Sequence, residues 1–177
     1  EPDAGLGFNT IIASNKDACA AAVAMARKLG FSAEIVSESL VGEARTAGVQ
    51  IAATARSRAA LRRPFMLIWG GETTVTVTGK GKGGRNLELA LASVKGMAGL
   101  AATHLLTLAT DGEDGPTDAA GAVVSGDTLE KATKLGLSPD DYLWNNDSYE
   151  FFSQLGDLLI TGPTGTNVND LTFLFEY

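Results

Sequence analysis

The residues best suited to chemistry stand in one glycine-rich loop. Glycines occupy positions 79, 81, 83 and 84, and Lys80, Lys82 and Arg85 stand among them. Glycine lets a backbone approach a ligand closely, and a helix that begins near Arg85 would turn its free N–H groups back into the loop. Cations and free N–H groups together predict an anion site. The tip of a solvated hairpin uses the same residues, so that alternative stays open.

The spacing of these glycines excludes two familiar phosphate-binding motifs. No Gly-Lys-Ser/Thr follows them, so the stretch is not a P-loop. No acidic ribose-binding residue stands behind a strand–glycine–helix turn, so it is not a dinucleotide fingerprint. A phosphate site here would therefore use a different arrangement.

A second candidate is the acidic loop from Thr110 to Asp118. It directly follows an apolar run at 105–109, which reads as a strand. Ligands of open α/β sheets bind at the carboxyl ends of strands, so the loop is a candidate metal-binding or hydroxyl-binding site. Its spacing does not fit an EF-hand. A solvated turn of Asp, Gly and Pro explains the same residues, and without further information we favour that interpretation.

The elements that must position these loops alternate between strands and helices. Strands are expected at 8–14, 33–36, 65–69, 75–77, 105–109, 158–161 and 171–175. Helices are expected at 15–29, 42–61, 85–97, 127–136 and 148–155, and residues 138–141 open another short helix, with Pro139 at its first position. This order predicts an α/β fold, a layered α/β/α domain with a mixed, mostly parallel sheet. The short connection between the last two strands predicts an antiparallel pair at one edge near the C-terminus. We expect a single domain over 1–177, with the motifs in 65–177.

Composition narrows the class of protein. The net charge of −7 argues against a nucleic-acid or membrane-surface partner. No apolar run is long enough to span a bilayer, and a cytoplasmic location follows by default. Cys19 is the one cysteine, which excludes an internal disulfide, and the single histidine, His104, has no second histidine or cysteine with which to share a metal.

Three stretches, in this order, resemble a known family. They are Gly70–Val75 with Gly83–Glu88, then Thr110–Gly121, then Gly162–Asp170. Together they are similar to the C-terminal, or MOFRL, domain of class II glycerate kinases, whose members are often labelled hydroxypyruvate reductase. The resemblance is close from Gly70 to the end of the chain.

The resemblance implies an activity for the intact protein. It implies transfer of the γ-phosphoryl group of ATP to the 2-hydroxyl of D-glycerate, with a divalent cation such as Mg²⁺. Family members also carry a larger N-terminal α/β domain, and their active site lies in the cleft between the two domains. That domain is absent from this chain, so we expect the chain alone to be inactive. A homodimer is left open.

The resemblance also suggests roles for particular residues. Arg85 has the planar fork that suits a phosphate or the carboxylate of glycerate, and Glu88 either orients it or belongs to a structural pair. Asp111 either accepts the proton of the substrate hydroxyl or holds Mg²⁺ with Glu113 and Asp114. The expected binding residues are Gly83, Gly84, Asn86, Glu88, Thr166, Asn167 and Asn169.

Two rival functions remain. The chain could be a stand-alone module that binds a small anion or docks on a partner without catalysis. It could also belong to an NAD(P)H-dependent hydroxypyruvate reductase, against which the missing dinucleotide fingerprint argues.

Overall fold

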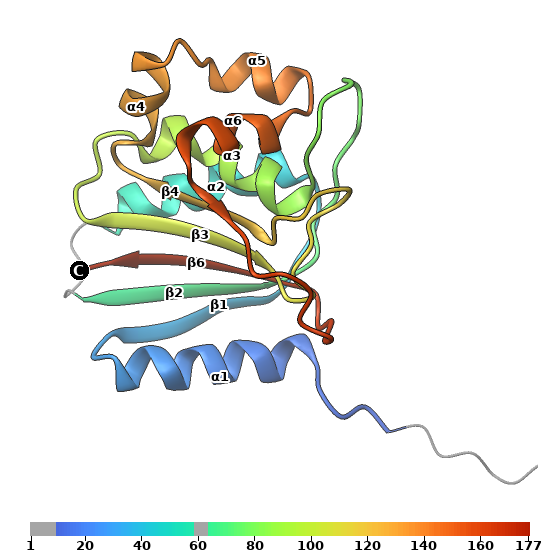
Figure 1. Cartoon of the computed structure of the whole chain (residues 1–177). Helices are drawn as coiled ribbons and strands as arrows, with labels where there is room; N and C mark the ends of the chain where they lie inside the picture. Colours follow the sequence, from blue (N-terminus) through green and yellow to red (C-terminus); the bar gives the residue numbers. More distant parts are fainter. Residues whose placement is uncertain (1–9, 59–63) are drawn as a thin grey trace, which may run out of the picture.

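The chain folds around one mixed sheet, seen in a computed structural model that describes residues 10–58 and 64–177. The strands are β1 (Ser32–Leu40), β2 (Phe65–Gly71), β3 (Thr103–Ala109), β4 (Gly121–Ser125), β5 (Leu158–Leu159) and β6 (Asp170–Glu176). They lie in the order β1-β2-β6-β3-β4-β5. Figure 1 shows the C-terminal strand, β6, inside the sheet between β2 and β3.

The expected α/β class and the mixed sheet are confirmed, but the balance of strand directions is different. Only β1 and β2 run parallel, and β6 is antiparallel to both of its neighbours. In the described residues the sheet is therefore mostly antiparallel. Strand β6 begins where β2 and β3 end, so it runs in the opposite direction to both. The expected pairing of 158–161 with 171–175 is also wrong, since the antiparallel edge is formed by β5 on β4.

Helices cover both faces of the sheet. They are α1 (Asn15–Lys28), α2 (Ala44–Ser57), α3 (Arg85–Met97), α4 (Thr128–Lys134), α5 (Pro139–Trp144) and α6 (Ser148–Leu155). In Figure 1, α1 lies on one face and the other five helices lie on the opposite face. Two apolar clusters match these layers: one joins α1 to the sheet, and a larger one joins α2, α3 and α6 to the sheet. This is the expected α/β/α layering.

Helices α2 and α3 pack closely against each other. A methyl group on Gly48 would lie 2.2 Å from the carbonyl oxygen of Leu89, so only glycine fits there. On the other helix, Gly96 leaves room for the methyl group of Ala52. The stripe of small residues in α2 thus brings two helix backbones together. Helix α3 begins at Arg85, as the sequence predicts, and almost all of its side chains are buried.

Three expected elements differ from the structure. Residues 75–77 form no strand, and the segment after β2 makes only one isolated bridge, between Glu43 and Thr74. Residues 10–14 also form no strand, while 8 and 9 lie outside the described part. Helix α2 ends at Ser57, and residues 59–61 of the expected helix lie outside that part as well. Among the described residues, no helix has the length and hydropathy that crossing a membrane requires.

Candidate functional site

The three candidate loops meet at one end of the central strands, where β2 and β3 end and β6 begins. Asp170 is paired there with Gly71 on one side and with Ala109 on the other. The glycine-rich segment follows β2, the acidic loop follows β3, and the third loop leads into β6. Figure 1 shows these loops gathered on the side of the sheet opposite the C-terminus.

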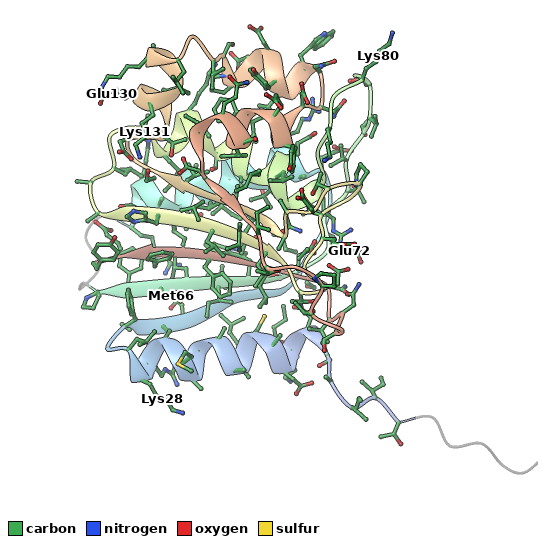
Figure 2. All side chains as sticks on the ribbon, viewed as in Figure 1. Lys28, Met66, Glu72, Lys80, Glu130 and Lys131 are labelled. Atoms are coloured by element: carbon green, nitrogen blue, oxygen red, sulfur yellow. The ribbon has the colours of Figure 1, made fainter. Side chains whose placement is uncertain are left out.

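Arg85 is held by two carboxylates at this edge. Its Nε donates to Oδ2 of Asp170 at 2.6 Å, and Nη2 donates to Oδ1 at 3.0 Å. The Nη1 atom lies 3.3 Å from Oε1 of Glu72, which stands just after β2 (Figure 2). The hydrogen bond to Asp170 raises the pKa of Arg85 above its ordinary value. Its fork is therefore charged and oriented, and about a quarter of the side chain remains exposed.

The first half of the glycine-rich loop is attached to the turn between α5 and α6. The N–H groups of Thr78 and Gly79 donate to Oδ1 of Asn146, both at 2.8 Å. The next three N–H groups, from residues 80 to 82, donate to Asn145 and Asp147. Five consecutive backbone donors are thus used by the protein itself.

The glycines of this half serve that attachment. A methyl group on Gly79 would lie 2.1 Å from the carbonyl oxygen of Asn145, and one on Gly81 would lie 2.3 Å from Cβ of Asp147. These glycines let the loop approach the turn between α5 and α6, whereas the sequence had suggested an approach to a ligand. The expected strand at 75–77 is also not formed there, and the N–H of Thr76 donates to the side chain of Glu43 at 3.3 Å and not to a neighbouring strand.

The three backbone N–H groups that follow residue 82 have no hydrogen-bond acceptor within the described chain. They belong to Gly83, Gly84 and Arg85, the residues at which α3 begins. The following two N–H groups, of Asn86 and Leu87, donate to the carboxylate of Asp114 at 3.1 and 2.8 Å. Unused donors therefore lie between two groups of donors that the protein satisfies itself. This is the part of the loop that can receive an anion.

Asp114 is an internal cap for α3. Its side chain is fully buried, and a methyl group on Gly84 would lie 2.4 Å from its Cγ. Burial raises the pKa of Asp114 from its ordinary value of 3.8 to about 6, against the opposite effect of the two backbone N–H bonds. Both of its oxygens face the first turn of α3. Asp114 therefore occupies part of the anion-binding capacity that the sequence assigned to a ligand.

Glu88 belongs to a structural pair. Its Oε1 accepts from Nε and Nη2 of Arg45 at 2.9 and 2.7 Å, and its Oε2 accepts from Nδ2 of Asn146 at 2.9 Å. Only 2 % of Glu88 is exposed. The structure thus resolves the alternative that the sequence left open: Glu88 pairs with Arg45 and is not a partner of Arg85.

A pocket of about 520 Å³ lies over the unused donors. Its lining includes Gly83, Gly84 and Arg85, together with Glu72 and Glu88. The two lysines of the loop have other positions: Lys82 lies over the ring of Tyr149, and Figure 2 shows Lys80 pointing outward from the tip of the loop. Arg85 is therefore the one cation of the three in the pocket wall.

The acidic loop and the third loop are joined to each other. Nδ2 of Asn167 donates to Oδ2 of Asp111 at 2.9 Å, and the hydroxyl of Thr164 donates to the carbonyl oxygen of Thr110 at 2.6 Å. The N–H of Asn169, a residue with a φ of 66°, donates to the side chain of Asn167 at 3.0 Å. The N–H of Thr166 donates to the hydroxyl of Thr164. These loops form one unit beside the pocket.

The predicted site residues thus divide into two groups. Gly83, Gly84, Arg85 and Glu88 line the pocket, whereas Asp111, Glu113, Thr166, Asn167 and Asn169 are not part of its wall. Asn86 is buried beneath it and donates to Asp114 at 3.4 Å. The residues that the structure describes contain no group of three or more His, Cys, Asp or Glu that could hold a metal ion.

Sequence reasoning missed four residues that shape the pocket: Glu72, Asp170, Arg45 and Asn146. Glu72 and Asp170 belong to the motifs named in the sequence analysis. Asp170 is the last residue of the third motif and directly precedes an apolar run, and this position could have marked it as a site residue. Arg45 and Asn146 are separated from Glu88 by 43 and 58 positions. Nothing local in the sequence points to either.

Comparison with solved structures shows which class of protein shares this fold. A crystal structure of glycerate kinase from Thermotoga maritima matches with a TM-score of 0.92 and 45 % identity, over 95 % of this chain and 42 % of that one. The fold is thus shared with part of a glycerate kinase. A family model described as the MOFRL family matches residues 65–170, and the chain belongs to this family.

Sequence relatives agree with this assignment. The chain is 47 % identical to D-glycerate 2-kinase of Thermotoga maritima over 91 % of its own length and 40 % of that protein. It is 45 % identical to glycerate 2-kinase of Pyrococcus horikoshii, over 92 % of its own length and 38 % of that protein. The chain therefore spans about two-fifths of the length of these curated relatives.

Proposed function

We propose that this chain is the C-terminal part of a glycerate 2-kinase. The intact protein would transfer the γ-phosphoryl group of ATP to D-glycerate in the cytoplasm. One observation carries this proposal: in a chain 47 % identical to a D-glycerate 2-kinase, one pocket is lined by Gly83, Gly84 and Arg85, the three residues whose N–H groups are unpaired. The partner that completes the cleft would be an N-terminal α/β domain of the same protein, and a homodimer is compatible with it.

The pocket residues suit phosphoryl transfer. The 2-hydroxyl oxygen of glycerate would form a bond to the γ-phosphorus, the bond from that phosphorus to the bridging oxygen of ADP would break, and the hydroxyl proton would pass to a base. Catalysis of this reaction is mostly positioning and stabilisation of negative charge. Arg85 and the N–H groups of Gly83–Arg85 would hold an anionic group of one substrate, either a phosphate of ATP or the carboxylate of glycerate.

Asp111 and Glu113 are the residues of this chain that fit a role at Mg²⁺. Both are at least partly exposed, and magnesium is commonly bound by one or two carboxylates together with nucleotide phosphates. Asp114 does not fit, because its two oxygens accept the N–H groups of α3. When bound, the cation would neutralise charge on the phosphates. Asp111 also remains the candidate acceptor for the substrate proton.

The third loop would form the rim of the site. Thr166, Asn167 and Asn169 hold its shape, and Asn167 links it to Asp111. We propose that this loop positions Asp111 and contacts substrate only once the other domain is in place. Asn86 would act beneath the pocket, through Asp114.

A turnover assay on the full-length protein tests the proposal. Purified protein is supplied with Mg·ATP and D-glycerate, and formation of ADP and 2-phosphoglycerate is measured. The proposal expects both products in equal amounts, and no turnover by residues 1–177 alone. ADP formation that does not depend on D-glycerate, or oxidation of NAD(P)H with hydroxypyruvate in its place, would contradict it.

A second candidate function is binding of a small anion without catalysis. The observation that favours it is that Arg85 and all three unpaired N–H groups come from this one chain. Calorimetry of residues 1–177 with 2-phosphoglycerate separates the two candidates. Tight binding by these residues, together with no turnover by the full-length protein, would favour the binding module.

A further inference from the structure

The amide of Asn146 joins the glycine-rich loop to the helical layer. Its Oδ1 accepts the N–H groups of Thr78 and Gly79, while its Nδ2 donates to Glu88 at 2.9 Å and to the carbonyl oxygen of Thr76 at 3.4 Å. Both polar atoms of the amide are therefore used. Asn146 is 7 % exposed, and its hydrogen bond to Glu88 is buried, where such bonds are strongest, while its bonds to residues 76, 78 and 79 are partly buried.

The backbone of Asn146 is held in an uncommon conformation. Its φ is 52°, in the left-handed region that L-residues other than Asn, Asp and Gly rarely adopt. Asparagine is thus one of few residues that tolerate this backbone and can also accept two N–H groups. A non-glycine residue in such a conformation, at a ligand-sized pocket, suggests a role beyond the turn itself.

Glu88 and Arg45 extend the connection across two helices. Glu88 is the fourth residue of α3, and Arg45 is the second residue of α2. Arg45 donates twice to one oxygen of Glu88, and the other oxygen receives Nδ2 of Asn146. The ion pair therefore fixes the acceptor that orients the Asn146 amide. Arg45, Glu88 and Asn146 form a chain from α2 to the loop.

The contacts of Asn146 lie directly before three unused donors of the glycine-rich loop. With Thr78 and Gly79 fixed on Asn146, the donors up to residue 82 bond to the turn, and the next three, of Gly83, Gly84 and Arg85, are left for a ligand. We infer that Asn146 is a positioning residue for the site, held by Glu88 and Arg45, and that it acts by fixing the register of the glycine-rich loop. This inference rests on the proposed kinase function.

Hydrogen exchange tests the anchoring step. In the full-length protein, Asn146→Gly keeps the left-handed backbone and removes the amide. We expect amide exchange in peptides covering 76–85 to become at least about tenfold faster, while peptides from β3 and β6 keep their rates. Unchanged exchange in 76–85 would overturn the inference, because the loop would then be held without Asn146.

Steady-state kinetics test the functional step. For Asn146→Gly we expect the KM for D-glycerate or for Mg·ATP to rise at least about tenfold, because the ligand-binding donors are no longer held in place. Val124→Ala is the matched control: Val124 is buried in β4, where it is paired with Leu105 of β3, so the variant should lower the melting temperature through a core cavity and leave both KM values unchanged. A merely structural role of Asn146 would give the result of this control.

A rescue experiment exchanges the donor and the acceptor of the hydrogen bond between Asn146 and Glu88. Asn146→Asp keeps an acceptor for Thr78 and Gly79 but places a carboxylate against Glu88, so its KM should rise as well. Adding Glu88→Gln supplies an amide donor at position 88 and should restore the KM to within about threefold of wild type. Failure of the rescue, or fast exchange with both KM values unchanged, overturns the positioning role alone. Wild-type protein without turnover overturns the proposed function and the positioning role together.

Discussion

The guanidinium of Arg85 and the carboxylate of Asp170 form two hydrogen bonds, 2.6 and 3.0 Å long, between the first residue of α3 and the first residue of β6. They connect the glycine-rich loop to the central strand of the sheet. Asp170 is 7 % exposed, so removing Arg85 would leave a buried carboxylate without its ion-pair partner. The pair orients the one cation in the pocket wall.

Arg85→Ala in the full-length protein is expected to lower kcat/KM for phosphoryl transfer at least about tenfold, about 1.4 kcal/mol or more. The reason is the loss of the charged fork at the pocket. Lys134→Ala is the control, because Lys134 is exposed and pairs with Glu130, one turn away on α4. Kinetics of Arg85→Ala that match those of the control would remove Arg85 from the site.

The pair itself can be measured by a double-mutant cycle. Asp170→Ala should lower kcat/KM by misplacing Arg85, and it should also reduce the free energy of unfolding by roughly 1–3 kcal/mol. In the Arg85→Ala background, Asp170→Ala should then cost little further activity, because its effect acts through Arg85. Fully additive losses in kcat/KM would show that Asp170 contributes independently.

Asp111→Asn tests the acidic loop. We expect the Mg²⁺ concentration at half-maximal activity to rise at least about fivefold, since one of the two remaining carboxylates is lost. Asp118→Asn is the matched control in the same loop, because Asp118 is exposed and accepts from the hydroxyl of Tyr149. An unchanged Mg²⁺ titration for Asp111→Asn would make the acidic loop structural.

Asp114 should give the unfolding free energy a particular pH dependence. Its pKa is about 6 in the folded chain against 3.8 as the ordinary value, so the folded state holds its proton more tightly. The contribution of Asp114 to stability is complete below pH 4 and is lost as the pH rises through 6, by about 3 kcal/mol at most.

Denaturant unfolding of wild type and Asp114→Asn at several pH values measures this contribution. The stability of wild type relative to the variant should decline between pH 4 and pH 7. The opposite slope would mean that the N–H groups of Asn86 and Leu87 outweigh the burial of the carboxylate. Parallel curves would mean that Asp114 does not titrate in this range.

Local patterns predicted the helices well and the strand order poorly. Helix α3 has the predicted bounds because its apolar positions, the glycines before it and the two glycines near its end are all local signals. The position of β6 depends on which strands it pairs with, and β2 and β3 lie far from it in the sequence. Loop length alone suggested a pairing with β5, and the sheet did not follow it.

Some residues of the candidate site could likewise be predicted from local motifs, and others could not. The motif order pointed to Arg85 and the loop glycines, which line the pocket. The motif order could not distinguish Asp114 from Asp111, which are three positions apart in one turn. The carboxylate of Asp114 caps the N-terminus of α3, whereas that of Asp111 accepts from Asn167 of the third loop. Asn146 was equally hidden, since its partners come from an extended loop and from α3.

The most direct test of the account observes the unused donors themselves. Full-length protein carrying nitrogen-15 in glycine and arginine is titrated with 2-phosphoglycerate, and its amide signals are followed by NMR. We expect saturable shifts at Gly83, Gly84 and Arg85, with Gly79 and Gly81 nearly unchanged because their N–H groups already bond to the turn between α5 and α6. Binding that leaves Gly83, Gly84 and Arg85 unshifted would contradict it.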